Sequence, residues 1–123
     1  MEIRANEYIR TKDGVIAKVE EITNEDGTTV YWFDNTIHTI YCEPIDFLFE
    51  NELEKYIAKH SDFLGELIEV GDYINGFIVE DKWEDAEHFR FESCDYWHNI
   101  DDSEIRCVVT KEQLEKMRYK VGD

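Results

Sequence analysis

The chain has 123 residues, of which 30 are acidic and 13 are basic, and its formal net charge is −17 at pH 7. A hydrophobic fraction of 42% and an aromatic fraction of 14% exclude intrinsic disorder as the explanation of that charge. A strongly negative folded surface repels nucleic acid and anionic membranes, so we expect no direct binding to either. Such a surface attracts proteins with basic grooves.

The cysteines and the N-terminus indicate the compartment. Cys42, Cys94 and Cys107 are odd in number and lack the spacing of a disulfide framework. The N-terminal segment has no apolar stretch typical of a signal peptide, and no apolar run approaches the length of a membrane span. We therefore expect a cytoplasmic protein with free thiols, and a chain of this size needs no disulfide or metal for stability.

The first part of the chain is predicted to consist of strands. Residues 7–11 and 15–22 flank Asp13-Gly14, a dipeptide that hairpin turns prefer. A turn over residues 24–27 leads to a strand over residues 28–33, which is rich in β-branched and aromatic residues. Asp34-Asn35 predicts another turn, and residues 36–42 predict a fourth strand.

A helical pattern begins near Asn51. Leu53, Tyr56, Ile57 and His60 have the spacing of one helix face. Glu54 follows Asn51 by three residues, which resembles a capping box. The sequence therefore predicts its one substantial helix over residues 51–60.

The second half repeats this order of elements. Residues 70–74 predict a strand, Asn75-Gly76 is the strongest two-residue hairpin signal, and residues 77–83 return from that turn. Residues 89–96 and 105–110 predict further strands. Thr110 and Gln113 form a capping box that predicts a short helix over residues 111–117, and residues 119–121 predict a closing strand.

The two halves also match weakly in sequence and in the same order. Gly14-Val-Ile corresponds to Gly76-Phe-Ile, and Leu53-Glu-Lys corresponds to Leu114-Glu-Lys. We predict a mainly β (α+β) protein with two diverged SH3-like small-barrel repeats. The first covers residues 1–69 and ends in the helix, and the second covers residues 70–123. The alternative is a single curved antiparallel sheet with one packed helix.

Several stretches resemble a family of small proteins from phages and mobile elements of Gram-positive bacteria. These are Glu7-Tyr-Ile-Arg-Thr-Lys-Asp-Gly, Leu67-Ile-Glu-Val-Gly-Asp-Tyr-Ile-Asn-Gly, and Val109-Thr-Lys-Glu-Gln with the ending Tyr119-Lys-Val-Gly. That family has no assigned activity, so the resemblance implies a phage setting and brings no catalytic residues. In size and charge the chain is also similar to many anti-CRISPR proteins, which implies inhibition of a host defence protein.

Thiol and imidazole side chains gather in the second half. Cys94, His98, Cys107 and His88 are the residue types of a tetrahedral zinc site. The common zinc modules contain a Cys-x2-Cys pair, which this sequence lacks. The alternative is that Cys107 is a core residue and that the histidines are exposed. Cys42 and His38 would complete this site or form another, so zinc is a candidate cofactor that the fold does not require.

Acidic side chains are concentrated in two segments of the second half. The first contains Glu80, Asp81, Glu84, Asp85 and Glu87, and the second contains Asp95, Asp101, Asp102 and Glu104 with Trp97 between them. Acidic runs usually form a solvated surface. Spaced carboxylates can also take the place of phosphates in a basic cleft, and an exposed Trp97 suits an interface anchor. We predict that these residues bind the partner.

Signatures of common enzyme classes are missing, including a phosphate-binding glycine loop, a Gly-x-Ser-x-Gly elbow and a His-Glu-x-x-His pair. The sequence therefore predicts a non-enzymatic acidic inhibitor of phage or mobile-element origin. Its expected partner is a basic, nucleic-acid-handling host protein such as a CRISPR effector nuclease. The alternative is a small zinc-stabilised interaction module without nucleic-acid mimicry.

Overall fold

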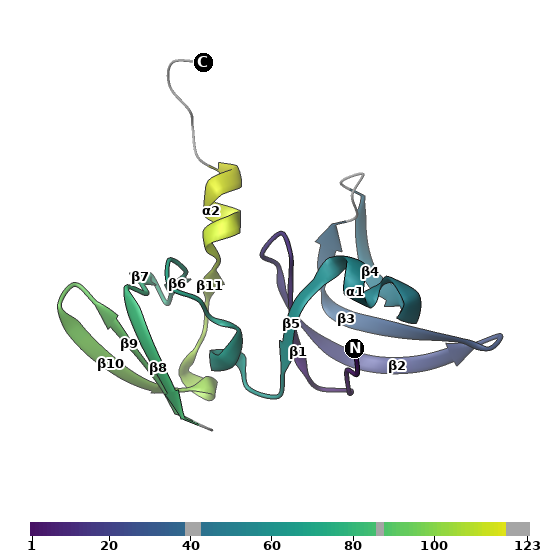
Figure 1. Cartoon of the computed structure of the whole chain (residues 1–123), viewed down its shortest axis with the longest axis horizontal. Coiled ribbons are helices and arrows are strands. Elements are labelled where there is room, and N and C mark those ends of the chain that lie inside the picture. Colours follow the sequence, from purple (N-terminus) through teal and green to yellow (C-terminus); the bar gives the residue numbers. More distant parts are fainter. Residues whose placement is uncertain (39–42, 86–87, 118–123) are drawn as a thin grey trace, which may run out of the picture. The chain divides into compact units, whose positions relative to one another are not determined.

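A computed structural model describes residues 1–38, 43–85 and 88–117. The chain divides into two compact units, Met1–Leu67 and Ile68–Asp123. The described residues form three antiparallel sheets and two short α-helices (Figure 1), which confirms the mainly β prediction. Within the described ranges, no helix is long and apolar enough to cross a membrane.

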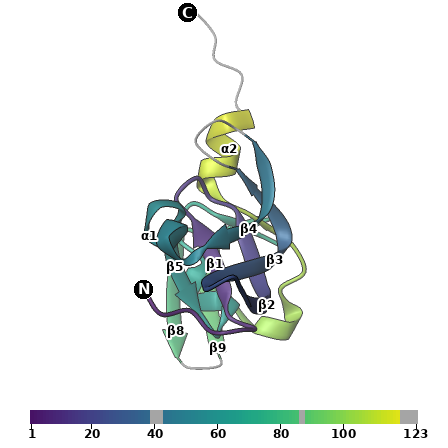
Figure 2. The same cartoon turned by 90° about the vertical axis from the view of Figure 1, so that its right-hand side faces the viewer.

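The first unit is built on a five-stranded antiparallel sheet. Its strands are β1 (Tyr8–Thr11), β2 (Ile16–Glu25), β3 (Thr28–His38), β4 (Pro44–Phe49) and β5 (Ile57–Ser61). The strand order is β4-β3-β2-β1-β5, so β5 returns beside β1 (Figure 2). The 3-10 helix η1 (Glu50–Glu52) and the helix α1 (Leu53–Tyr56) connect β4 to β5, and η2 (Leu64–Leu67) ends the unit.

The core of the first unit combines residues from every strand. Val19, Tyr31 and Leu48 of the β2-β3-β4 meander are buried together with Leu53 of α1 and Ile57 of β5. Burial of an aliphatic or aromatic side chain of this kind stabilises a fold by roughly 1.5–3 kcal/mol. The contacts of Leu53 and Ile57 therefore hold the connection and the last strand against the meander.

A buried carboxylate also connects the start and the end of this unit. Glu7 is 4% exposed, its Oε1 lies 3.0 Å from Nδ1 of His60 in β5, and its Oε2 accepts a hydrogen bond from the amide of Arg4. Burial by itself raises the pKa of Glu7. The Arg4 amide and His60 lower it, and the resulting pKa lies below its ordinary value.

The prediction of one substantial helix over residues 51–60 is wrong, because α1 covers only Leu53–Tyr56 and the helix over Lys111–Met117 is longer. The helix α1 ends at Tyr56, and Ile57 and His60 belong to β5, opposite Thr11 and Ile9 of β1. Pairing with β1 satisfies the main chain of this segment and buries the β-branched Ile57, and this tertiary pairing overrides the helical spacing. The helical segment also starts earlier than predicted, because the Phe49 amide donates to Glu52 Oε1 at 3.1 Å.

The turn predicted at Asp34-Asn35 is also wrong, because both residues lie within the long strand β3. Asp34 Oδ1 accepts a hydrogen bond of 2.7 Å from the Lys18 amide, and Asn35 Nδ2 donates to the Ile16 carbonyl at 3.1 Å. The register of β2 and β3 shifts between Val19 and Glu21, and these two bonds hold β3 to the part of β2 that precedes the shift. The fourth strand is β4, and residues 39–42 of the predicted strand over 36–42 lie outside the described residues.

The second unit contains two three-stranded antiparallel sheets. One has the order β10-β9-β8, with β8 (Asp81–Asp85), β9 (His88–Ser93) and β10 (Tyr96–Asp101). The other has the order β11-β6-β7, with β6 (Tyr73–Ile74), β7 (Phe77–Ile78) and β11 (Val108–Val109). The 3-10 helix η3 (Asp102–Glu104) follows β10, and the helix α2 (Lys111–Met117) follows β11.

The core of this unit is small and is supported by a buried carboxylate. Ile68, Ile74, Val79, Phe89 and Phe91 form its apolar cluster. The fully buried Asp72 accepts hydrogen bonds from the Glu69 amide at 2.7 Å and from the Lys111 amide at 2.9 Å. Asp72 thus fixes the start of α2, where the main-chain amides have no partner within the helix.

The predicted capping box and hairpin turn of this unit are confirmed. The Thr110 amide donates to Gln113 Oε1 at 2.9 Å, and the Gln113 amide donates to Thr110 Oγ1 at 3.3 Å. Asn75 and Gly76 both have positive φ, as a type I′ turn requires. The predicted closing strand over residues 119–121 lies outside the described residues.

Candidate protein-interaction face

The sheet β10-β9-β8 has one face in the core and one face toward solvent. On β9, Phe89 and Phe91 are 1% and 2% exposed, while Arg90 between them is exposed. Side chains alternate along a strand, so the neighbours of Arg90 on the same face follow from the register. Trp83, Arg90 and Asn99 form one cross-strand row, and Asp81, Glu92 and Trp97 form the next. We call these residues, together with Asp101, the outer face.

Two tryptophans dominate the outer face. Trp83 of β8 is 53% exposed and Trp97 of β10 is 44% exposed. The Arg90 guanidinium carbon lies 5.4 Å from the centroid of the Trp97 ring, within the range of a cation–π interaction. Trp83, Arg90 and Trp97 line a shallow hollow of about 230 Å³. The three side chains therefore present an apolar, preformed surface.

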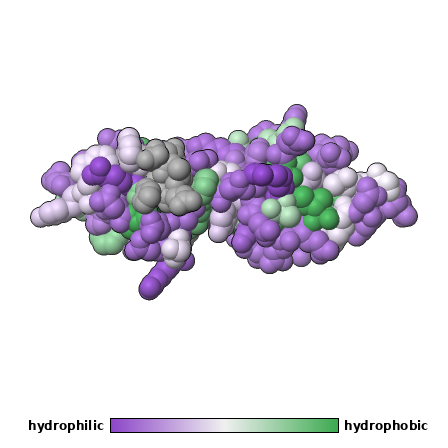
Figure 3. Space-filling view, turned by 90° about the horizontal axis from the view of Figure 1, so that it is seen from below, coloured by the Kyte–Doolittle hydropathy of each residue, from purple (hydrophilic) through white to green (hydrophobic). Residues whose placement is uncertain are grey.

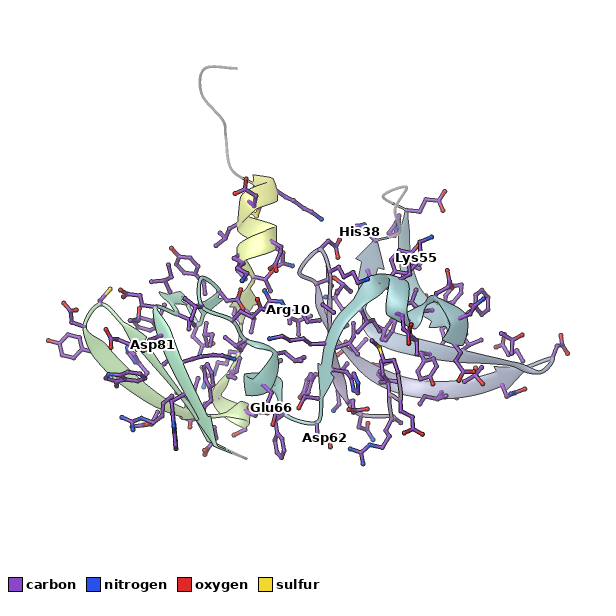
Figure 4. The ribbon with its side chains drawn as sticks, in the orientation of Figure 1. Arg10, His38, Lys55, Asp62, Glu66 and Asp81 are labelled. Carbon is purple, nitrogen blue, oxygen red and sulfur yellow. The ribbon has the colours of Figure 1, made fainter. Side chains whose placement is uncertain are left out.

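Carboxylates surround this aromatic centre. Asp81 and Glu92 share the row of Trp97, and Asp101 lies two residues beyond Asn99 on β10. Asp81 and Asp101 are exposed and Glu92 is half-buried; Figure 4 labels Asp81 on β8. The face of the molecule seen in Figure 3 is largely hydrophilic. An apolar centre with a charged rim is the usual composition of a protein interface.

The two acidic segments predicted from the sequence come together only in part. Asp81 and Trp97, from different segments, lie in one row of the sheet with Glu92 between them. Glu80 precedes β8, and its Oε1 accepts a hydrogen bond from the Cys94 amide at the β9–β10 turn. Asp95 lies in that turn and is exposed.

The last carboxylates of the second segment belong to η3. Asp102 and Glu104 lie within it, and Glu104 Oε1 accepts a hydrogen bond of 3.0 Å from the Asp101 amide. Glu104 therefore stabilises the end of β10 in the structure. Whether these residues also bind a partner stays a prediction.

Some predicted residues lie outside the description. Glu84 and Asp85 belong to β8 and His88 belongs to β9, but the structure describes only their main chain. Glu87 lies outside the described residues. The outer face is therefore defined without them.

The described zinc-ligand candidates have other surroundings. His98 of β10 packs against the rings of Phe91 and Phe77, with centroids 4.8 and 4.9 Å away. Cys94 lies in the β9–β10 turn and Cys107 immediately precedes β11, and both are exposed. His38 ends β3 (Figure 4) and Cys42 is outside the described residues. Among the described residues, no group of three or more His, Cys, Asp or Glu side chains could hold a metal ion.

Sequence reasoning missed four members of the outer face, namely Trp83, Arg90, Glu92 and Asn99, and the first three carry the argument. Their signal was the alternation of Phe89 and Phe91 with Arg90 and Glu92, which already assigns the two sets to opposite faces. Trp83 joins the exposed set through its pairing with Arg90. That pairing depends on the register of the β8–β9 hairpin, which alternation within one strand does not define.

The first unit carries a different aromatic cluster. Phe47 contacts both Trp32 and Phe49, with ring centroids 5.1 and 5.5 Å apart. Trp32 Nε1 donates to Thr23 Oγ1 at 2.9 Å, and Phe49 is 39% exposed. These rings are largely occupied by each other, and Phe49 supplies a matched aromatic control for the outer face.

Comparison of the chain with protein-family models, curated proteins and solved structures finds no match. The candidate site therefore rests on the geometry of the outer face.

Proposed function

We propose that this protein is a non-enzymatic binding protein whose outer face occupies a basic surface of a nucleic-acid-handling host protein, such as a CRISPR effector nuclease. The observation that carries the proposal is the pair Trp83 and Trp97, exposed on a sheet face with Arg90 between them. Tryptophan and arginine are enriched among the residues that contribute most to protein–protein affinity.

The charge of the chain supports a basic partner. A net charge of −17 attracts positively charged proteins over distances comparable to the Debye length, about 8 Å at physiological salt. Asp81, Glu92 and Asp101 extend that charge around the tryptophans. Electrostatic attraction then accelerates association, and burial of the aromatic centre slows dissociation.

The strand connections support the proposed SH3-like duplication. In the first unit a hairpin, two more strands and η1 precede β5, which pairs with β1. In the second unit a hairpin, the meander β8-β9-β10 and η3 precede β11, which pairs with β6. We propose that β7 and β8 together correspond to β2. The helix α2 follows β11 while α1 precedes β5, so the predicted equivalence of Leu53 and Leu114 is wrong.

The proposed role is that of an inhibitor from a phage or mobile element. The resemblance of residues 7–14 and 67–76 to small phage proteins supports this setting. A bound acidic protein excludes nucleic acid from a basic groove because both compete for the same positive side chains. Catalysis by this chain is not needed for such inhibition.

The test is capture of host proteins on the immobilised chain, followed by a nuclease assay. We expect a basic nucleic-acid-handling protein to bind at low salt, to elute as salt is raised, and to lose nuclease activity in the presence of the chain. A Trp83→Ala/Trp97→Ala variant should capture less of it, while Phe49→Ala should behave like the parent. Failure to capture any basic nucleic-acid-handling protein at low salt would overturn the proposal.

A further inference from the structure

The strand β10 is an edge strand of its sheet. In the order β10-β9-β8 it has β9 as its one neighbour among the described residues. Its six residues pair with β9 without a register shift. Cys94 and Asp95 form the two-residue turn before it, and their φ angles of 53° and 68° are those of a type I′ hairpin. One long side of β10 is thus a regular sheet edge.

The register shows which main-chain groups face this edge. In an antiparallel pair, residues alternate between those that hydrogen-bond to the partner strand and those that face away. The Glu92 carbonyl accepts a hydrogen bond of 2.8 Å from the Glu80 amide, so the main chain of Glu92 faces away from β10. Trp97 lies opposite Glu92 and Asn99 lies two residues on, so their N–H and C=O groups face the edge.

This edge lacks three of the features that commonly prevent strand addition, namely lysine, proline and bulges. Neither lysine nor proline occurs in the β10 sequence Tyr-Trp-His-Asn-Ile-Asp. The edge strands of the first unit differ: β4 begins with Pro44 and has a register shift against β3, and β5 contains Lys59 and has a shift against β1. In the second unit the other edge strands also differ, because β8 contains Lys82 and because β7 and β11 have only two residues each. Among the described edges, β10 is therefore the one best suited to accept another strand.

Charge and exposure define the segment that fits. Trp97 and Asn99 lie on the outer face, where Glu92 is opposite Trp97, Arg90 is opposite Asn99 and Asp101 follows two residues later. Carboxylates thus outnumber the one cation beside this edge, and Arg90 is engaged with the Trp97 ring. On the other side lie Tyr96, which is 74% exposed, His98 and Ile100. Basic side chains suit the first side, where they can also contact the Trp97 ring, and apolar side chains suit the second. A second copy of this chain is disfavoured because each copy carries −17.

We propose that β10 binds an extended segment of the basic partner as an additional strand, with arginine or lysine alternating with apolar residues. The inference rests on the proposed function and specifies how the outer face engages its partner. Hydrogen bonds from the main chain of Trp97 and Asn99 contribute affinity, and the outer face selects basic side chains.

The first experiment uses synthetic peptides of about eight residues, the length of an ordinary strand. A peptide alternating arginine and valine should bind the parent protein in fluorescence titrations, and one alternating glutamate and valine should not. In an antiparallel addition, arginines opposite Trp97 and Asn99 have their amides directed at β10. N-methylation of the arginine amides should therefore weaken binding by about tenfold or more, whereas N-methylation of the valine amides should leave it unchanged.

The second experiment changes the edge itself. Asn99→Pro removes an amide that faces away from β9, so it blocks strand addition and leaves the hairpin paired. We expect Asn99→Pro to bind the arginine–valine peptide about tenfold or more weakly than Asn99→Ala, which lacks the same side chain but keeps the amide. Circular dichroism tests whether Asn99→Pro folds. If it does not fold, the comparison of the methylated peptides on the parent protein tests the inference instead.

The outcomes separate this inference from the proposed function. If the parent captures its basic partner but methylation position and Asn99→Pro have no effect on peptide binding, the strand inference is overturned and the proposed function stands. If the parent captures its partner but does not bind the arginine–valine peptide, the strand inference is likewise overturned and the proposed function stands. A third outcome is that the parent dimerises as its concentration rises and that Asn99→Pro does not. This result would assign the edge to a second copy of the chain and overturn the proposal that it binds a basic segment.

Discussion

The guanidinium of Arg90 lies over the ring of Trp97 on the neighbouring strand, 5.4 Å from its centroid. This contact restrains an exposed tryptophan before any partner arrives. Ordering a side chain at an interface costs about 0.5–1.5 kcal/mol, and a side chain that is already ordered avoids that cost. Arg90 is basic on a face proposed to bind a basic partner, so its stacking on Trp97 is the property that explains its presence there.

Arg90→Lys therefore distinguishes stacking from charge. A lysine keeps the charge but lacks the planar group that stacks on an indole ring. We expect Arg90→Lys and Arg90→Ala both to increase the dissociation rate of the captured partner by several-fold, measured by surface plasmon resonance. If Arg90→Lys behaves as the parent and Arg90→Ala binds more tightly, the contact with Trp97 does not contribute to binding.

Reversal of one charge on the outer face should reduce the rate of association. Asp81→Lys removes a carboxylate from the cross-strand row of Trp97 and introduces a cation that repels a basic partner. We expect a several-fold lower association rate at low salt and a weaker dependence on salt, with little effect on stability because Asp81 is exposed. Glu25→Lys in the first unit makes the same change in net charge, and an equal loss from that control would assign the effect to the overall charge.

The buried Glu7 predicts a defined dependence of stability on pH. Burial raises its pKa, while the Arg4 amide and His60 lower it to a net value below the ordinary 4.5. A carboxyl with a lowered folded pKa stabilises the fold above its unfolded pKa and loses this contribution as the pH falls through the folded value. Glu7→Gln should destabilise the first unit at pH 7 by about 1–3 kcal/mol.

Urea denaturation from pH 7 to below pH 4 measures this effect. The difference in unfolding free energy between the parent and Glu7→Gln should be largest at neutral pH and should shrink below pH 4.5, the ordinary pKa. A difference that is constant across this range would mean that the Glu7 charge is not stabilising. Glu25→Gln, on an exposed residue of the same unit, is the matched control.

Asp72 should be one of the most sensitive positions of the second unit. It is fully buried and accepts hydrogen bonds from the Glu69 and Lys111 amides. Asp72→Ala leaves both amides without this partner, so we expect a loss of about 2–4 kcal/mol in unfolding free energy. Asp81→Ala, at an exposed position of the same unit, is the control. Hydrogen exchange should show faster exchange of the Lys111 amide in Asp72→Ala. Unchanged exchange at Lys111 would contradict its role in fixing α2.

The packing of His98 makes a prediction about zinc. Its ring lies 4.8 Å from Phe91 and 4.9 Å from Phe77, so a phenylalanine should replace it with little loss of stability. We expect His98→Phe and the parent to have the same melting temperature with and without a chelator. A structural zinc site would instead be close to full occupancy, and chelation or His98→Phe would unfold the second unit.

Local signals predicted the Asn75-Gly76 turn and the start of the helix α2. Thr110 and Gln113 are adjacent in space whenever a helix starts there, and Asn75-Gly76 adopts positive φ without tertiary help. Such features depend on a few neighbouring residues, so the sequence was sufficient. Asp34-Asn35 failed because its side chains bond to β2, a contact that no local pattern contains.

The remaining errors also involve long-range pairing. Ile57 and His60 fit a helix face, but β1 recruits them into β5. Trp97 was predicted as an anchor from its acidic neighbourhood, whereas Trp83 required knowledge of its register with Arg90. The sequence therefore predicted which segments contain the candidate site. The residues that share one surface could be assigned only from the pairing of the strands.

The affinity of the captured basic partner for Trp83→Ala/Trp97→Ala tests the central claim most directly. Loss of two interface anchors typically costs about 2 kcal/mol or more each, so the account predicts at least a hundredfold weaker binding with an unchanged fold. Phe49→Ala, an exposed aromatic on the first unit, should retain the parent affinity. A folded double variant that binds and inhibits as strongly as the parent would contradict the assignment of the outer face.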